Sequence, residues 1–122
     1  MKFSIIGTGF ISPSHIQAIR DVRGKIVDVV NTSRGENTWR EMIKTTSADC
    51  IVILTPNYLH YEMIQESLNN NKIVLCEKPI VIKKEDGEKL KDKKNVFTVL
   101  QLRYHPLLEE IRNNIKEHNE IE

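Results

Sequence analysis

The first thirty residues alternate between strand-like and helix-like patterns, and this alternation constrains the fold more than any other feature. Lys2 to Gly7 is a run that favours a strand, and Gly7-Thr8-Gly9 interrupts it. Ser12-Pro13 then supplies an N-cap and a first helical position, before apolar residues at helical spacing: Ile16, Ile19 and Val22. Because Lys25 to Val30 is a second apolar strand, the pattern predicts two parallel strands joined by a right-handed helical crossover.

The rest of the chain repeats this alternation. We expect helices near residues 39–44, 58–69 and 84–93 and after residue 106, with strands at residues 50–54, 72–76 and 96–102. Apolar stripes mark two of these helices: Tyr61, Ile64 and Leu68 in one, and Leu108, Ile111 and Ile115 in the other. The sequence therefore predicts one α/β domain over residues 1–122, with a doubly wound, mostly parallel sheet of about five strands. Residues 31–50 are too few for a further helix and strand, so we expect one edge strand to be missing.

Composition argues against several classes of function. The 18 basic and 17 acidic residues leave a net charge of +1, without the basic excess typical of a nucleic-acid-binding domain. The apolar run at residues 51–54 is far shorter than the roughly 20 residues of a membrane span, and Gly7 interrupts any signal peptide. Cys50 and Cys76 lack paired spacing, so we predict no disulfide and no metal site. We expect a cytoplasmic protein.

The turn after the first strand resembles the start of a dinucleotide-binding fingerprint. Gly7 permits a tight turn, and Gly9 lets backbone N–H groups approach a pyrophosphate at the N-terminus of the following helix. Phe10 and Ile11 continue this loop as candidate cofactor contacts. Ser12 stands where a third glycine or alanine is usual, and we expect its hydroxyl to cap the helix. The alternative is a glycine turn that binds no ligand.

The end of the second strand indicates which dinucleotide would bind. An acidic residue that holds the ribose 2′-hydroxyl is usual at this point, but this chain has Asn31. An amide does not repel a 2′-phosphate, and Ser33 and Arg34 can donate hydrogen bonds to one. The pattern favours NADP(H) over NAD(H), with a polar loop that contacts nothing as the alternative.

Two further turns follow the third and fourth strands. Thr55-Pro56-Asn57, with His60 beyond it, and Glu77-Lys78-Pro79 should both lie at the carboxyl edge of a parallel sheet, where ligands bind in such folds. We therefore expect both turns to face the same crevice as the glycine turn. Taken alone, His60 could equally be a helix-cap residue, and Glu77-Lys78 an ion pair at a strand end.

Three segments resemble the cofactor domain of a known family, in order and approximate spacing: GTGFISPSHIQAI, DCIVILTPNYLHYEMIQESLNNNKIVLCEKPI and VLQLRYHPLL. The family is the glucose-fructose oxidoreductase, inositol dehydrogenase and rhizopine-catabolism (Gfo/Idh/MocA) group of NAD(P)-dependent sugar dehydrogenases. The SPSH and LQLRYHP segments look most like the branch that acts on nucleotide-linked N-acetyl sugars, the 3-dehydrogenases.

The resemblance implies a Rossmann-type domain and hydride transfer between nicotinamide and a sugar carbon. Lys78 would lie beside the reacting hydroxyl, with Glu77 holding its ammonium by a charge-assisted bond and Pro79 shaping the turn. It also implies residues that line the cofactor crevice, Asn57 and His60, and residues where the substrate approaches, Arg103 and His105.

The family also has a second domain, which carries the rest of the substrate site, including a catalytic histidine, whereas the printed sequence ends at Glu122. We therefore expect either a piece of a longer enzyme or a shortened relative, incomplete for catalysis alone. Whether the chain is an enzyme stays open. The uncovered surface near residues 102–115 is expected to favour self-association into a homo-oligomer. The alternative function is a degenerate, non-catalytic Rossmann module for self-association or partner binding.

Overall fold

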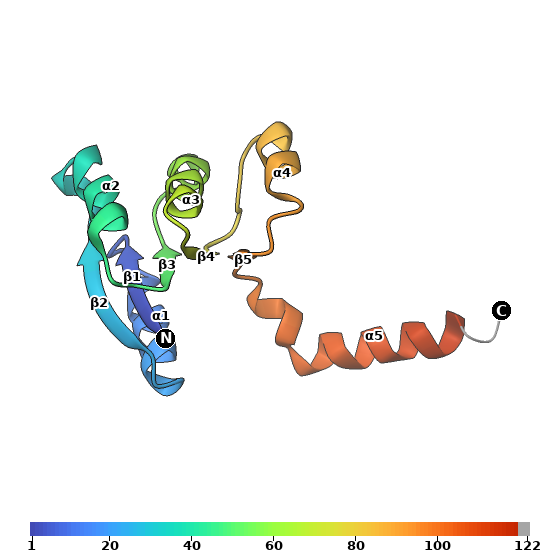
Figure 1. Ribbon diagram of the computed structural model, residues 1–122. Helices are drawn as coiled ribbons and strands as arrows, with labels where there is room; N and C mark the ends of the chain where they lie inside the picture. The colour runs from blue at the N-terminus through green and yellow to red at the C-terminus, as the bar shows by residue number, and fades with distance from the viewer. Residues whose placement is uncertain (120–122) are drawn as a thin grey trace.

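Five parallel strands form one sheet in the computed structural model, which describes residues 1–119 with the side chains of residues 36 and 117–119 excepted (Figure 1). The sheet order is β2-β1-β3-β4-β5, and every neighbouring pair is parallel. The strands are β1 (Lys2–Ile6), β2 (Lys25–Val30), β3 (Cys50–Ile53), β4 (Ile73–Cys76) and β5 (Val96–Thr98). The predicted α/β fold with a five-stranded parallel sheet is therefore confirmed.

The order of the strands has a doubly wound pattern. The chain moves outward from β1 to β2, then crosses back to place β3, β4 and β5 on the other side of β1. The six-stranded version of this fold has another strand outside the one that corresponds to β2. Here the segment between β2 and β3 forms the short helix η1 (Thr32–Arg34) and helix α2 (Glu36–Thr45) instead. As expected from its length, this segment adds no edge strand.

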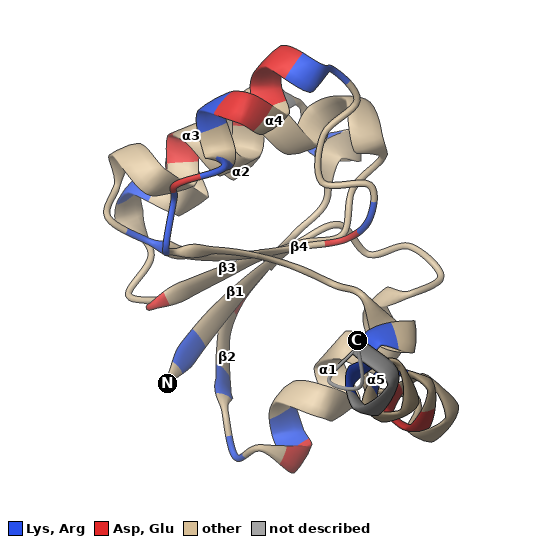
Figure 2. Ribbon diagram, turned by 90° about the vertical axis from the view of Figure 1, so that its right-hand side faces the viewer, with Lys and Arg blue, Asp and Glu red and all other residues tan. Residues whose placement is uncertain are grey.

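Helices cover the two faces of the sheet unequally (Figures 1 and 2). Helix α1 (Ser12–Asp21) lies on one face, and α2, α3 (His60–Asn69) and α4 (Lys84–Leu90) lie on the other. Figure 2 shows that the lysine, arginine, aspartate and glutamate residues of α2, α3 and α4 gather on the side of these helices that faces away from the sheet. No helix of the described part of the chain combines the length and the apolar character that crossing a membrane requires.

Two apolar clusters hold these layers together. The larger lies under α2 and α3 and includes Trp39, Ile43 and Ile64, and the smaller packs under α1 around Ile5 and Ile19. In α3 the fully buried apolar positions are Met63 and Ile64, so the buried face is centred slightly away from the predicted stripe. Its outer members are only half-buried: Tyr61 and Leu68.

The C-terminal part of the chain leaves the sheet. The strand predicted for residues 96–102 ends at Thr98, because its partner β4 has already ended at the opposite residue, Cys76. A short helix η3 (Gln101–Tyr104) and helix α5 (Pro106–Asn119) follow, and α5 extends away from the sheet (Figure 1). The predicted stripe of α5 is exposed along its length: Leu108, Ile111 and Ile115.

Candidate functional site

Four turns lie along the carboxyl edge of the sheet, each directly after a strand. They are Gly7 to Gly9 after β1, Asn31 after β2, Thr55 to Asn57 after β3, and Glu77 to Pro79 after β4. Because β1 to β4 are parallel and pair side by side, their carboxyl ends share one edge of the sheet. The structure thus brings together the turns that the sequence singled out.

The first turn requires glycine at one position and is open at the other. Gly7 has a φ of +106°, and a Cβ there would lie 2.8 Å from the backbone carbonyl carbon of Leu54. Its N–H donates to the Val30 carbonyl at 2.9 Å, which joins the ends of β1 and β2. A Cβ on Gly9 would meet nothing within 4 Å. The backbone at Gly9 is therefore open to a ligand, as the fingerprint requires for a pyrophosphate.

The residues after the glycines differ from their predicted roles. Ile11 is the N-cap residue, so Ser12 is already helical, and its hydroxyl donates to the Gly9 carbonyl at 2.8 Å instead of capping the helix. The predicted cap is therefore wrong, although the bond closes the turn. Phe10 is 100% exposed, whereas Ile11 is half-buried against the apolar cluster under α1.

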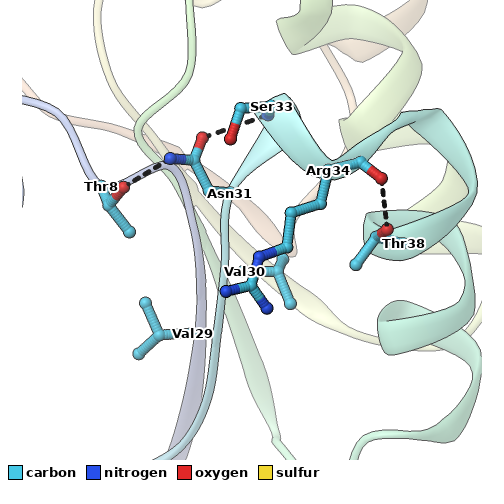
Figure 3. Close-up of a pocket in the computed structure, with 7 residues that line it drawn as sticks. All are labelled: Thr8, Val29, Val30, Asn31, Ser33, Arg34 and Thr38. Carbon is cyan, nitrogen blue, oxygen red and sulfur yellow. Dashed lines mark hydrogen bonds between the residues drawn. The ribbon is translucent and has the colours of Figure 1, made fainter.

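Asn31 organises the corner between β1 and β2. Its Nδ2 donates to Thr8 Oγ1 at 2.8 Å, and its Oδ1 accepts the Ser33 N–H at 3.3 Å. Figure 3 shows Asn31 between these two partners, with the Arg34 side chain extending along the same pocket. The pocket has a volume of about 330 Å³, and Val29, Val30 and Thr38 complete its lining. The exposed guanidinium of Arg34 makes this corner positively charged.

His60 is buried rather than exposed to the crevice. The residue is 1% exposed, with Nε2 lying 2.9 Å from the Thr55 carbonyl and Nδ1 lying 2.7 Å from the Pro79 carbonyl. A neutral imidazole can donate to one of these oxygens, and an imidazolium to both. The role implied for His60 as a lining residue is therefore wrong for its side chain, which instead joins the turns after β3 and β4. Asn57 is exposed at the start of the short helix η2 (Asn57–Leu59).

Glu77 has a different partner from the one implied. Its carboxylate is 2.7 Å from His15 Nε2, and its other oxygen accepts the backbone N–H of Lys78 at 3.2 Å. Among the described side chains, no ion pair joins Glu77 to the Lys78 ammonium, so that implied contact is wrong. Lys78 is exposed, and a cis peptide bond links it to Pro79. His15 was missed as a site residue, although its position in the first turn after the glycine turn placed it near this edge.

Arg103 approaches Lys78, whereas His105 does not. Lys78 and Arg103 line a cavity of about 290 Å³ together with Leu100, Gln101 and Leu102. Arg103 and His15 also line a larger cavity of about 580 Å³ over β4 and β5. His105 lies directly before α5, where its Nδ1 accepts the Leu107 N–H at 3.2 Å, and it lines neither cavity.

The two cysteines are inert parts of the core. Burial raises the pKa of Cys50 to about 11 and the pKa of Cys76 to about 12, because a thiolate would be desolvated there. Neither thiol is therefore ionised near neutral pH. Within residues 1–119, no three histidine, cysteine, aspartate or glutamate side chains are grouped so that they could hold a metal ion.

Comparison with known proteins agrees with this geometry. A model of an oxidoreductase family with an NAD-binding Rossmann fold matches residues 1–97, which include all four turns. The chain belongs to the Gfo/Idh/MocA family. Its β1 to β4 edge is therefore the edge of an NAD-binding Rossmann domain, and the resemblance seen in the sequence is confirmed.

Three similar proteins of known name show how much of a relative's length this Gfo/Idh/MocA domain matches. The 2,7-anhydro-N-acetylneuraminate hydratase of Escherichia coli is 30% identical over 70% of this chain and 26% of that protein. The scyllo-inositol 2-dehydrogenase (NADP(+)) of Bacillus subtilis is 26% identical over 74% of this chain and 32% of that protein. The structure of the WlbA dehydrogenase from Bordetella pertussis, in complex with NADH and UDP-GlcNAcA, superposes with a TM-score of 0.81, 28% identity and coverage of 95% and 42%. The chain thus spans less than half the length of each.

Proposed function

We propose that this domain binds NADP(H) along the carboxyl edge of the sheet, with the nicotinamide beside Lys78. The reaction it serves is hydride transfer between the nicotinamide and a hydroxyl-bearing carbon of a nucleotide-linked sugar. One observation carries this proposal: Lys78 is an exposed residue between two anchored neighbours, at the same edge as the glycine turn. The NADH and UDP-GlcNAcA bound to the related WlbA dehydrogenase support it.

The topology divides the proposed site into two halves. In open α/β sheets a dinucleotide crosses the edge where the strand order reverses, which here is between β1 and β3. The pocket of Asn31 and Arg34 at the end of β2 would receive the adenosine ribose. Gly9 and the N-terminus of α1 would bind the pyrophosphate. The nicotinamide half would then lie over the turns after β3 and β4, next to Lys78.

The residues around Lys78 have complementary parts in the chemistry. The nicotinamide supplies the hydride acceptor when the sugar is oxidised and the hydride donor when it is reduced. In the oxidising direction, the neutral amine of Lys78 would bind the sugar hydroxyl and accept its proton, becoming an ammonium, as the hydride leaves the carbon that carries this hydroxyl. Arg103, which shares a cavity with Lys78, would hold an anionic group of the substrate through its planar guanidinium.

The choice of NADP(H) rests on the Arg34 pocket. We expect wild-type protein to bind NADPH more tightly than NADH, and Arg34→Ala to lower NADPH affinity about tenfold or more, since a charge-assisted bond is lost. NADH affinity should stay within about threefold. Arg20→Ala, which removes an exposed arginine of α1, is the matched control and should change neither affinity. Isothermal titration calorimetry with both dinucleotides measures all of these values.

The outcomes separate the parts of the proposal. Tighter binding of NADH than of NADPH would overturn the choice of cofactor and leave dinucleotide binding intact. No heat and no thermal shift with either dinucleotide would overturn the proposed function. A Lys78→Met variant that binds dinucleotide normally, yet no longer reduces it with a nucleotide-linked sugar in an enzyme containing this domain, would support the role of Lys78. Full turnover by that variant would contradict it.

We also propose that the domain self-associates through its C-terminal arm, defined as η3 and α5. Large apolar side chains are exposed there: Leu102, Tyr104, Leu107, Ile111 and Ile115. Exposed apolar surface of this kind favours contact with another apolar surface. The arm of a second copy presents such a surface, so two copies can pair through the same residues. The non-catalytic alternative would use this surface without dinucleotide binding.

A further inference from the structure

Two histidines from opposite faces of the sheet hold the turn that carries Lys78. His15 belongs to α1 on one face, and His60 begins α3 on the other (Figure 1). His15 bonds to the residue before Lys78, and His60 bonds to the residue after it. The two bonds therefore fix both flanks of one exposed lysine.

The contact of His15 ties the Lys78 turn to the glycine turn. His15 lies in the first turn of α1, whose N-terminus follows Gly9, so a bond from its ring spans from the proposed pyrophosphate site to β4. Glu77, whose carboxylate receives this bond, is 8% exposed as a residue, and its carboxylate also accepts the Lys78 N–H at 3.2 Å. Through this carboxylate, α1 fixes the backbone of Lys78 itself. A buried carboxylate that lost His15 would be costly, so the contact is strongly favoured in the folded state.

The contact of His60 ties the Lys78 turn to the turn after β3. Its Nδ1 is 2.7 Å from the Pro79 carbonyl, and its Nε2 is 2.9 Å from the Thr55 carbonyl. Since both acceptors are backbone atoms, the ring fixes the path of the chain on either side of the proposed nicotinamide position. The residue is 1% exposed, so its side chain is surrounded by protein.

We propose that His15 and His60 are positioning residues, which hold Lys78 at a fixed place relative to Gly9 and so set the affinity for the nicotinamide half of the dinucleotide. The inference rests on the proposed function and adds residues to it. A turn ordered before binding does not have to be ordered by the ligand, and such preorganisation raises affinity. The adenosine half binds over β1 and β2, so its affinity should not depend on these contacts.

The test compares two ligands that share the adenosine half. NADPH carries the nicotinamide, and 2′-phospho-ADP-ribose lacks it. His15→Leu removes the donor to Glu77, whereas His15→Gln places an amide N–H near the position of Nε2. We expect His15→Leu to lower NADPH affinity about tenfold without changing 2′-phospho-ADP-ribose affinity, and His15→Gln to restore NADPH affinity to within about threefold of wild type.

A pair of His60 variants tests the contact on the Pro79 side of Lys78, because each variant removes one of the two ring nitrogens. By side-chain length, His60→Asn keeps a donor near Nδ1 and so keeps the Pro79 bond, while His60→Gln keeps a donor near Nε2 and the Thr55 bond. Each variant thus keeps a donor to one of the two carbonyls and removes the ring nitrogen that faces the other. We expect His60→Gln to bind NADPH more weakly than His60→Asn, with equal affinities for 2′-phospho-ADP-ribose. The pair is informative even where His15→Leu fails to fold, and circular dichroism melting identifies that case.

The result that overturns the inference differs from the one that overturns the proposed function. Equal losses of affinity for both ligands in His15→Leu, or unchanged NADPH affinity in both His15→Leu and His60→Gln, would show that the histidines do not act through the Lys78 turn. Failure of wild-type protein to bind either ligand would instead overturn the proposed function itself.

Discussion

Helices α3 and α5 carry apolar residues at the same helical spacing but lie in opposite surroundings. In α3, Met63 and Ile64 are fully buried between the sheet and α2, whereas in α5 the side chains of Ile111 and Ile115 are exposed. Periodicity determines which residues share one face of a helix. What covers that face depends on the rest of the fold: the sheet covers it in α3, and no described element covers it in α5.

The largest expected effect comes from comparing the same substitution in these two helices. Ile64→Ala should lower the free energy of unfolding by about 3 kcal/mol, because it leaves a cavity in a closely packed core. Ile111→Ala, at a side chain that is 44% exposed, should change it by less than about 0.5 kcal/mol. Urea denaturation followed by circular dichroism measures both. Equal losses would mean that the arm is part of the cooperative core.

This contrast also explains how much of the fold could be predicted. Alternating strands and helices, the βα connections and the missing edge strand follow from local patterns over residues 1–98, and the structure agrees with them. The end of β5 could not be predicted, because residues 96–102 are uniformly favourable for a strand and the limit is set by the partner β4. Likewise, the residues of α5 predict an amphipathic helix, but they do not indicate which surface packs against its apolar face.

The candidate site was predictable where backbone conformation limits the choice of residue, and not where side chains pair over long distances. Gly7 is fixed by its positive φ and by the closeness of Leu54, so the sequence pattern identifies it. The partner of Glu77 lies 62 residues away, in α1, and adjacency to Lys78 suggested the wrong pair. His60 was recognised by its motif, but only the folded structure shows that its ring contacts the backbone carbonyls of two turns.

The second prediction applies the same contrast between crowded and open surroundings to two glycines. Gly7→Ala should lower the free energy of unfolding by about 2 kcal/mol, because alanine is strained at a φ of +106° and its Cβ would meet the Leu54 backbone. Gly9→Ala should leave stability within about 0.5 kcal/mol, since its Cβ meets nothing. It should nevertheless weaken dinucleotide binding, because the added methyl group projects where the pyrophosphate would approach. Paired denaturation and calorimetric titrations check this; a destabilised Gly9→Ala would contradict it.

The third prediction concerns the buried thiols of Cys50 and Cys76, which belong to the packed core and not to the exposed arm. Well below the ordinary pKa of 9.0 both thiols are neutral in the folded and the unfolded state, and their contribution to stability is complete. As pH rises above the ordinary pKa of 9.0, the unfolded thiols ionise, while the folded pKa values of about 11 and 12 delay ionisation of Cys50 and Cys76. Stability should therefore fall, by roughly 1 kcal/mol per thiol at about pH 10.

Lysines and tyrosines also titrate in this range, so the thiol contribution needs a control. The difference between wild type and a Cys50→Ala, Cys76→Ala variant in urea denaturation isolates it, since the other groups are the same in both proteins. The variant should lose less stability between about pH 8 and about pH 10 than wild type. Parallel losses in the two proteins would show that the thiols ionise equally in the folded and unfolded states.

The smallest expected effect on stability, and the sharpest test of the arm, is the introduction of charge into it. Ile111→Glu and Ile115→Glu should leave the free energy of unfolding of dilute protein within about 0.5 kcal/mol of wild type, because both side chains are already exposed. If the arm is the self-association surface, the same substitutions should shift the concentration-dependent sedimentation of wild type towards the monomer, since an apolar contact would now bury two carboxylates. Asp21→Ala, at an exposed residue of α1, is the control and should sediment like wild type.

A wild-type protein that stays monomeric at every concentration would contradict self-association. The unequal effects of Ile64→Ala and Ile111→Ala on stability would still show that the C-terminal arm is not part of the packed core. Denaturation and sedimentation together thus distinguish a helix whose apolar face is only exposed to solvent from a helix whose apolar face also mediates self-association.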